Sequence, residues 1–390
     1  MAEKYLTLLR QDRLEALGVA ATQSGRPVHL LEKDIWVVWA IDALFSSEFA
    51  KHLVFKGGTS PSKAYDVIGR FSEDIDVTYD VRELIPELVG TGPPIPKTNS
   101  QAKKWREAID KRLPVWVRDA ALPAISKHVT ATGADVKVSI EGTDIYIDYD
   151  PLAIGTGYVP PRVKIEFGAR STGEPCEERP ITCGAAAHLP ELEFPSTKPR
   201  VMRPKRTFWE KATAVHVFCK QGTQGDRLSR HWHDLVRLDD AGYAQEALDD
   251  RVLAHGGAEL KGKFFCEKDR GGNPIDYGAV VSGALQLVPD ADGLKALEAD
   301  YEKMADEGIL LDDAEPFADL VTRCADLEQR ANNRASPSGP IEEHLRQPTS
   351  VYREREILWR LFDDGPGMIG LTQIASKKSS ETSNKKNRIQ

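Results

Sequence analysis

The spacing of hydrophobic residues along the chain predicts its first structural elements. Residues 29–48 are expected to form a helix with a wide apolar face, because their apolar residues recur at steps of three and four. These recurring residues are Leu31, Ile35, Val38, Ile41 and Phe45. A short apolar strand is expected at 52–55, a helix at 60–70 and an alternating strand at 74–80.

The pattern then changes twice more. Residues 102–129 are expected to be helical, with interruptions near Pro114 and Pro123. Three segments with period-two alternation follow, DVKVSI, DIYIDYD and RVKIEFG, and they predict three strands. Residues 171–206 hold many prolines and turn residues, so a long excursion with little regular structure is expected there. From Thr207 onward the pattern is mainly helical.

This order of elements predicts an α+β fold, in which a mixed sheet with flanking helices is followed by a helical C-terminal region. We expect an α/β domain with N-terminal helices over 1–206 and a helical domain over 207–375. The helical domain is expected to contribute residues that complete an active site on the first domain. The tail, 376–390, has five basic residues, one acid and almost no apolar ones, so disorder is expected there.

Composition narrows the class of protein. The chain has 390 residues, of which 41% are hydrophobic and 29% charged, as in ordinary globular proteins. No run approaches the ~18 apolar residues that span a bilayer, and the N-terminus lacks the apolar segment of a signal peptide. A cytoplasmic protein without membrane contact is therefore expected. The net charge of −8 argues against general nucleic-acid binding but leaves a local basic groove open.

The stretch FKGGTS, followed by DIDV, carries the first candidate chemistry. Gly57 and Gly58 permit close backbone approach to a ligand, and a helix that starts at Ser60 offers free N–H groups to a phosphate. Asp74 and Asp76 are alternate residues of a strand, so both carboxylates are expected on one face, where they suit Mg²⁺. An ordinary turn followed by a solvated strand face explains the same letters, and the pair alone favours that explanation.

A third carboxylate is available on a later strand. In RVKIEFG the apolar residues alternate with Lys164 and Glu166, which therefore share the other face. If that strand lies beside the first, Glu166 joins Asp74 and Asp76 in a cluster that holds two metal ions. A solvated Lys/Glu face is an equally good interpretation of Glu166 taken alone.

Five motifs in order, FKGGTS-x-SKAY, RFSEDIDV, VKIE, RTFWEKA and HDLVRL, resemble the AbiEii/AbiGii-type nucleotidyltransferase toxins of bacterial toxin–antitoxin and abortive-infection systems. The resemblance covers roughly 29–80 and 160–240 and leaves everything beyond about residue 245 outside it. It implies a polymerase-β-like nucleotidyltransferase core followed by a helical region. It also implies Mg²⁺, with Mn²⁺ as the alternative, and an NTP as substrate.

The resemblance assigns roles to individual residues. The nucleotide-binding residues that it implies are Gly57, Gly58, Thr59, Ser60, Lys63 and Ser72. The implied catalytic residues are Asp74, Asp76, Glu166, Lys211 and Asp234, of which Asp74, Asp76 and Glu166 would hold the metal. Lys211 would contact phosphate, and Asp234 would orient Lys211 or Arg230 or take a proton from the attacking hydroxyl.

The implied function is a toxin that arrests growth in phage defence by moving a nucleoside monophosphate to an acceptor, with a tRNA 3′ end as the leading choice. The implied partner is an antitoxin encoded in the same operon. Two alternatives remain: transfer to a protein or small molecule, and a degenerate module that binds NTP or a protein partner without turnover.

Overall fold

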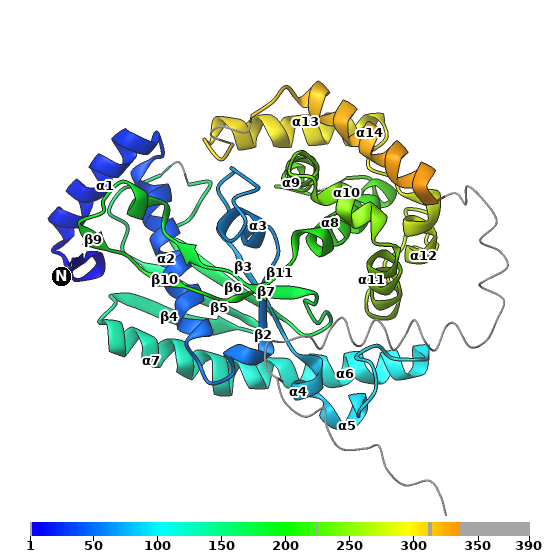
Figure 1. The fold of residues 1–390 in the computed structure, drawn as a ribbon, viewed down its shortest axis with the longest axis horizontal. Coiled ribbons are helices and arrows are strands. Elements are labelled where there is room, and N and C mark those ends of the chain that lie inside the picture. The colour runs from blue at the N-terminus through cyan, green and yellow to red at the C-terminus, as the bar shows by residue number, and fades with distance from the viewer. Residues whose placement is uncertain (1, 156, 224, 311–313, 336–390) are drawn as a thin grey trace, which may run out of the picture.

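The computed structural model describes residues 2–335 except 156, 224 and 311–313. Its centre is a mixed seven-stranded sheet in the described part of the chain (Figure 1). The strands are β2 (Leu53–Lys56), β3 (Ile75–Tyr79), β4 (Val136–Glu141), β5 (Asp144–Tyr149), β6 (Arg162–Gly168), β7 (Cys176–Glu178) and β11 (Arg200–Met202). They lie in the order β4-β5-β6-β3-β2-β11-β7, which places the predicted strands of the glycine and acid motifs side by side.

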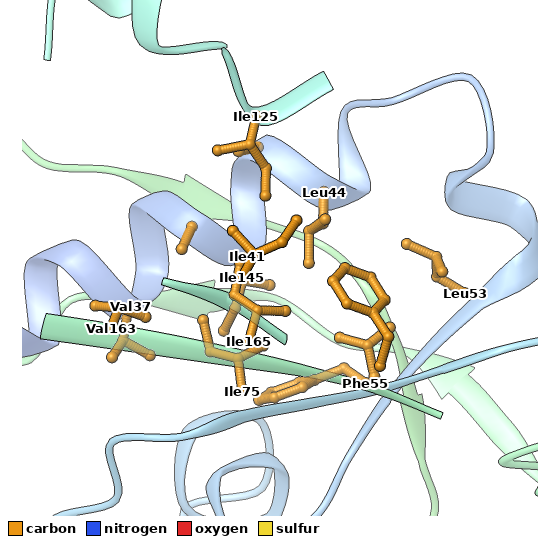
Figure 2. Packing of buried hydrophobic residues seen from close by; sticks show 14 of the residues in the cluster. Val37, Ile41, Leu44, Leu53, Phe55, Ile75, Ile125, Ile145, Val163 and Ile165 are labelled. Carbon is orange, nitrogen blue, oxygen red and sulfur yellow. The ribbon is translucent and has the colours of Figure 1, made fainter. Parts of the chain in front are cut away.

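One face of this sheet is covered by helices α2 (Val28–Phe45) and α7 (Leu122–Thr132). Val37, Ile41 and Leu44 of α2 lie over Ile75, Ile145, Val163 and Ile165 of the strands, with Ile125 of α7 behind them (Figure 2). Alternation in β3 and β6 sends these apolar side chains into the core and leaves the residues between them on the opposite face.

A second hydrophobic core lies among the C-terminal helices, which gather beside the sheet in Figure 1. These helices are α8 (Pro204–Gln221), α9 (Ser229–Asp240), α10 (Tyr243–Asp249), α11 (Arg251–Phe264), α12 (Tyr277–Ala279), α13 (Ala291–Asp306) and α14 (Phe317–Ala335). Phe208, Trp232 and Leu327 are buried in this second core. The prediction of an α+β fold with a helical C-terminal region is confirmed.

The domain limits stay a prediction. The change from sheet to helices falls close to residue 206, since α8 begins at Pro204 directly after β11. The end of the predicted second domain and the basic tail, 336–390, lie outside the described residues. No described helix has the length and apolar character that a membrane span requires.

Helix α3 is shorter than predicted: it covers only Thr59–Lys63. Asp66 has a left-handed backbone, with φ of 54°, and this conformation is incompatible with a continuing helix. The chain therefore returns toward β3 through a loop and not through the long helix that the pattern suggested.

The interruption predicted at the prolines of 102–129 is wrong. Helix α6 (Asn99–Trp116) contains Pro114, and a π-helical turn, Val117–Ala121, joins it to α7 without a break. The π turn lies between Pro114, near the end of α6, and Pro123, the second residue of α7, so the helical path continues past both prolines.

The excursion at 171–206 holds more regular structure than expected. Its two ends supply β7 and β11, and β11 lies parallel to β2 with Val201 opposite Phe55. Between them, short strands β8 (Ile181–Thr182) and β10 (Ser196–Thr197) form an antiparallel pair. Strands of two or three residues carry no readable alternation, so only their pairing in the folded chain reveals them.

Candidate functional site

The glycine turn lies where β2 ends and α3 begins. Gly57 has φ of +78°, and a Cβ atom added to it would lie 1.9 Å from Oδ2 of Asp76. Gly58 has ordinary backbone angles, but an added Cβ would lie 2.7 Å from an Nη atom of Arg70. Glycine is therefore needed at both positions, because a side chain would collide with Asp76 at Gly57 and with Arg70 at Gly58. Gly57 also needs the freedom of glycine for its positive φ.

Three acids meet beside this turn. Asp76 of β3 is directly opposite Glu166 of the parallel strand β6, and Asp74 precedes β3. All three line a cavity of about 310 Å³ together with Gly57 and Gly58. We call it the glycine-turn cavity. Its volume lies at the lower end of the range for small-molecule sites.

Hydroxyl groups hold the turn against the acid strand. Thr59 Oγ1 lies 2.7 Å from Ser72 Oγ and also donates a hydrogen bond to the Asp74 carbonyl oxygen. Ser60 Oγ donates to the Gly57 carbonyl oxygen at 3.2 Å. Thr59 and Ser72 line the cavity, whereas Ser60 is buried outside it. Of the three predicted hydroxyl residues, Thr59 and Ser72 therefore lie at the cavity, and Ser60 stabilises the turn through its bond to Gly57.

The opposite wall of the cavity comes from the helical region. Lys211 of α8 and Arg230 of α9 line it, 45 and 64 residues after Glu166 in the sequence (211 − 166 and 230 − 166). Lys211 Nζ lies 2.6 Å from Oδ2 of Asp234, which anchors the lysine from behind. The resemblance predicted that Lys211 and Asp234 belong together, and the structure brings them together.

Asp234 itself is fully buried and holds two cations. Arg70 donates to both of its oxygens, through Nε at 2.6 Å and Nη2 at 2.8 Å, in addition to the contact with Lys211. Burial alone raises the pKa of the Asp234 carboxyl, but the charges of Arg70 and Lys211 outweigh burial and hold the pKa well below its usual range.

One role considered for Asp234 is therefore corrected. A carboxylate with two fixed cationic partners and no exposure cannot take a proton from an attacking hydroxyl. Arg230 also does not pair with it, since its Nη1 faces Asp74 Oδ2 at 3.7 Å. Asp234 is a positioning residue that fixes Lys211 and Arg70.

Asp74 is electrostatically unlike Asp234. Burial raises the pKa of Asp74, and the charge of neighbouring Glu73 raises it further, whereas Arg230 lowers it. Glu73 is itself buried, and Lys33 of α2 donates to it at 2.5 Å. Asp74 therefore gains a proton at a higher pH than an ordinary aspartate does.

Glu166 is held by its own strand. Lys164 Nζ bonds to Glu166 Oε1 and lies 3.0 Å from Asp144 Oδ2 of β5. Although burial opposes its charge, the hydrogen bonds to Glu166 and Asp144 raise the pKa of Lys164. In the described residues no three His, Cys, Asp or Glu side chains already form a metal-binding group. The three carboxylates nevertheless line one cavity, and hard cations such as Mg²⁺ take carboxylate oxygens and water.

Lys63 does not lie near the predicted phosphates, and this prediction is wrong. It is absent from the lining of the glycine-turn cavity, and its Nζ pairs with Asp34 of α2. Because α3 has only five residues, Lys63 stands at its far end and is directed toward the core helix. Asp34 also accepts a hydrogen bond from Gly184 N at 2.7 Å, so the pair links α2 to α3 and to the excursion.

Further cavity residues were missed by the sequence analysis, among them Lys56, Arg70, Thr207 and Glu210. Lys56 lies within FKGGTS, Arg70 within RFSEDIDV, and Thr207 and Glu210 within RTFWEKA, so their place in these motifs was the available signal. Glu210 precedes Lys211, and its pKa is about 2, because the nearby Lys261, Arg206 and Lys56 outweigh burial. Its partners come from α8 and α11, which sequence spacing does not connect.

Comparison with known proteins agrees with this geometry. No curated protein sequence matches the chain significantly. A sequence model described as "Nucleotidyl transferase AbiEii toxin, Type IV TA system" matches residues 39–323. The match extends well beyond residue 245, so the limit placed on the resemblance was too narrow: most of the C-terminal helices belong to the family. The chain is therefore a member of the AbiEii family of nucleotidyl transferase toxins of type IV toxin–antitoxin systems.

Proposed function

We propose that this toxin transfers a nucleoside monophosphate from an NTP to the 3′ end of an RNA, with tRNA as the leading acceptor. One observation carries the proposal. Three carboxylates on the sheet and two cations on the helices face each other across a single cavity beside a glycine turn. Acids that hold cations and fixed positive charges that hold phosphates are the two components that phosphoryl transfer requires.

Each wall has its own task. Gly57 and Gly58 let the triphosphate approach the backbone, and Lys211 and Arg230 neutralise its oxygens. Asp74, Asp76 and Glu166 would hold Mg²⁺, with Mn²⁺ as the alternative. When bound, the metal supplies charge neutralisation at the reacting phosphate.

The reaction forms one bond and breaks one. The oxygen of the acceptor hydroxyl attacks the α-phosphorus in line, the bond from that phosphorus to the bridging oxygen breaks, and pyrophosphate leaves. The hydroxyl proton passes to a carboxylate on the sheet side of the cavity. Lys211, fixed by Asp234, stabilises the negative charge of the departing pyrophosphate.

In the cell this reaction would arrest growth as part of phage defence, in the cytoplasm, and an antitoxin from the same operon would restrain it. Family membership supports the antitoxin partner and the NTP. Expression of the wild-type chain alone should be toxic, and expression of Asp76→Ala should not.

The direct test uses purified protein, Mg²⁺, labelled NTPs and total tRNA. Labelled RNA is expected from the wild type, and Asp74→Ala should abolish the product while the thermal melting curve stays unchanged. Label on a protein or a small molecule would replace the RNA acceptor by one of those classes. NTP affinity without any transfer would favour the degenerate binding module and overturn the proposal.

A further inference from the structure

A second cavity of about 380 Å³ opens on the other side of the catalytic acids. It shares Lys56, Asp76 and Glu166 with the glycine-turn cavity, so these three residues form a common wall between the two spaces. Its outer boundary comes from α6 and from Phe265, the residue directly after α11. We call it the α6 cavity.

The two cavities differ in their chemistry. The glycine-turn cavity has the cations Lys211 and Arg230 in its lining, which suits a polyphosphate. The α6 cavity instead has an apolar side, formed by Ile109, Leu113 and Phe265. An uncharged group with flat apolar faces fits this lining better than a triphosphate does.

Cationic groups also line the α6 cavity, but they are fewer than in the glycine-turn cavity. Arg170 stands at the cavity and forms an ion pair with Asp110 of α6, and Lys56 is part of the common wall. One charged backbone phosphate could be met there, together with hydroxyl donors such as Thr143 and Ser171. Apolar and aromatic contacts for a base, with a few polar groups at the edge, are typical of sites for single-stranded RNA.

From this arrangement we propose that the α6 cavity receives the terminal nucleoside of the single-stranded RNA acceptor and presents its hydroxyl at the common wall. This inference rests on the proposed function and adds where the acceptor lies. Asp76 and Glu166 are shared by both cavities, whereas Lys211 lines only the glycine-turn cavity. A hydroxyl beside these two acids would therefore approach the α-phosphate from the side away from Lys211, toward which pyrophosphate would leave. In-line displacement requires the two groups on opposite sides of the phosphorus.

Gly168 offers a way to close the α6 cavity alone. It lines this cavity and not the glycine-turn cavity, and a Cβ added to it has no neighbour closer than the Val77 carbonyl oxygen, at 4.0 Å. Its backbone is not left-handed. Gly168→Leu should therefore fill the space without straining β6. Gly18→Leu on α1 (Arg10–Ser24) is the matched control, since an added Cβ there also meets nothing within 4 Å.

The first measurement is transfer to RNA. Gly168→Leu and Phe265→Ala should each raise the KM for the RNA acceptor about 10-fold or more, because a base loses its contact surface. The dissociation constant for NTP should stay within about twofold of wild type. Gly18→Leu should behave as wild type in both. Unchanged acceptor KM in Gly168→Leu, with the melting temperature preserved, would overturn the proposal.

The second measurement separates failure of this inference from failure of the proposed function. A 5′-fluorescein-labelled single-stranded RNA of about 12 nucleotides is titrated with protein, and anisotropy reports binding without any chemistry. If the wild type transfers nothing, the proposed function fails, yet weaker binding by Gly168→Leu still supports the acceptor site. The acceptor site is rejected if the wild type does not bind this RNA, or if Gly168→Leu binds it as tightly as the wild type does. Label transferred only to protein rejects it as well.

Discussion

The two walls of the glycine-turn cavity carry opposite charges and are built by different means. On the sheet wall, the register of β3 and β6 places Asp76 opposite Glu166, and Asp74 lies directly before β3 and lines the same cavity. The helical wall fixes Lys211 through Asp234, a fully buried acid that also binds Arg70. The carboxylates of the sheet wall line the cavity, where they can bind a new cation. Asp234 of the helical wall is already bound to Arg70 and Lys211. Charge of the same type thus serves binding on one side and rigidity on the other.

Removal of the acid from each wall tests this difference most strongly. Asp234→Ala leaves Arg70 and Lys211 buried without a counter-charge, so the free energy of unfolding should fall by about 3–5 kcal/mol. Asp76→Ala at the sheet wall should change it by less than about 1 kcal/mol. Both variants should lose transferase activity. Urea denaturation decides the comparison, and equal destabilisation of the two variants would contradict it.

A smaller effect is expected where the two walls touch. In Gly58→Ala the new methyl group meets the Arg70 guanidinium, so the unfolding free energy should fall by about 1–3 kcal/mol and NTP should bind more weakly. Gly92→Ala is the control, because an added Cβ there has no neighbour within 4 Å. Denaturation and an NTP titration measure both effects, and a Gly58→Ala protein as stable as the control would show that Arg70 moves freely.

The pH dependence of activity probes the contact between the walls. Asp74 must be ionised to bind a cation, and its pKa is already raised, so kcat/KM should fall as the pH drops through that pKa. Arg230 lowers the pKa of Asp74, so in Arg230→Gln this pKa should rise further and the acid limb should move to higher pH. Arg112→Gln, at an exposed pair on α6, should leave the limb in place. A shift to lower pH in Arg230→Gln would have the wrong sign.

The smallest effect on NTP binding should come from Lys63. Lys63→Gln removes the cation that pairs with the buried Asp34, so the unfolding free energy should fall by about 1–3 kcal/mol, whereas NTP affinity should stay unchanged. Lys211→Gln, on the helical wall, should weaken NTP binding about 10-fold or more. Isothermal titration with a non-hydrolysable NTP compares them; weaker binding by Lys63→Gln would restore this lysine to the site.

Much of the sheet wall could be predicted because its signal is local. Alternation identified β3 and β6, and a shared face for Asp74, Asp76 and Glu166 needed only the further assumption that the two strands are neighbours. The helical wall could be approached only through family resemblance. Arg70 and Asp234 are 164 residues apart, and no spacing rule connects them.

The errors have physical causes as well. Lys63 lies on a helix that a left-handed Asp66 keeps short, so its direction could not be judged from a longer helical pattern. Strands β7 and β11 are too short to show a period, and their place in the sheet depends on pairing with β2 and with each other. Sequence patterns therefore predicted the long elements, whereas the short strands form only through pairing with other strands in the folded chain.

Strand β11 has a consequence for how this chain can change during evolution. It lies against β2, whose end is the glycine turn, and it leads directly into α8, which carries Lys211. An insertion between Val201 and Lys211 would rotate the lysine away from the turn by about 100° per residue, since a helix has 3.6 residues per turn. The segment 179–199 carries no such phase requirement. Relatives are expected to differ in length at its exposed turn, 190–191, and not at Ile181, Cys183 or Leu189, which are buried in the core over the sheet.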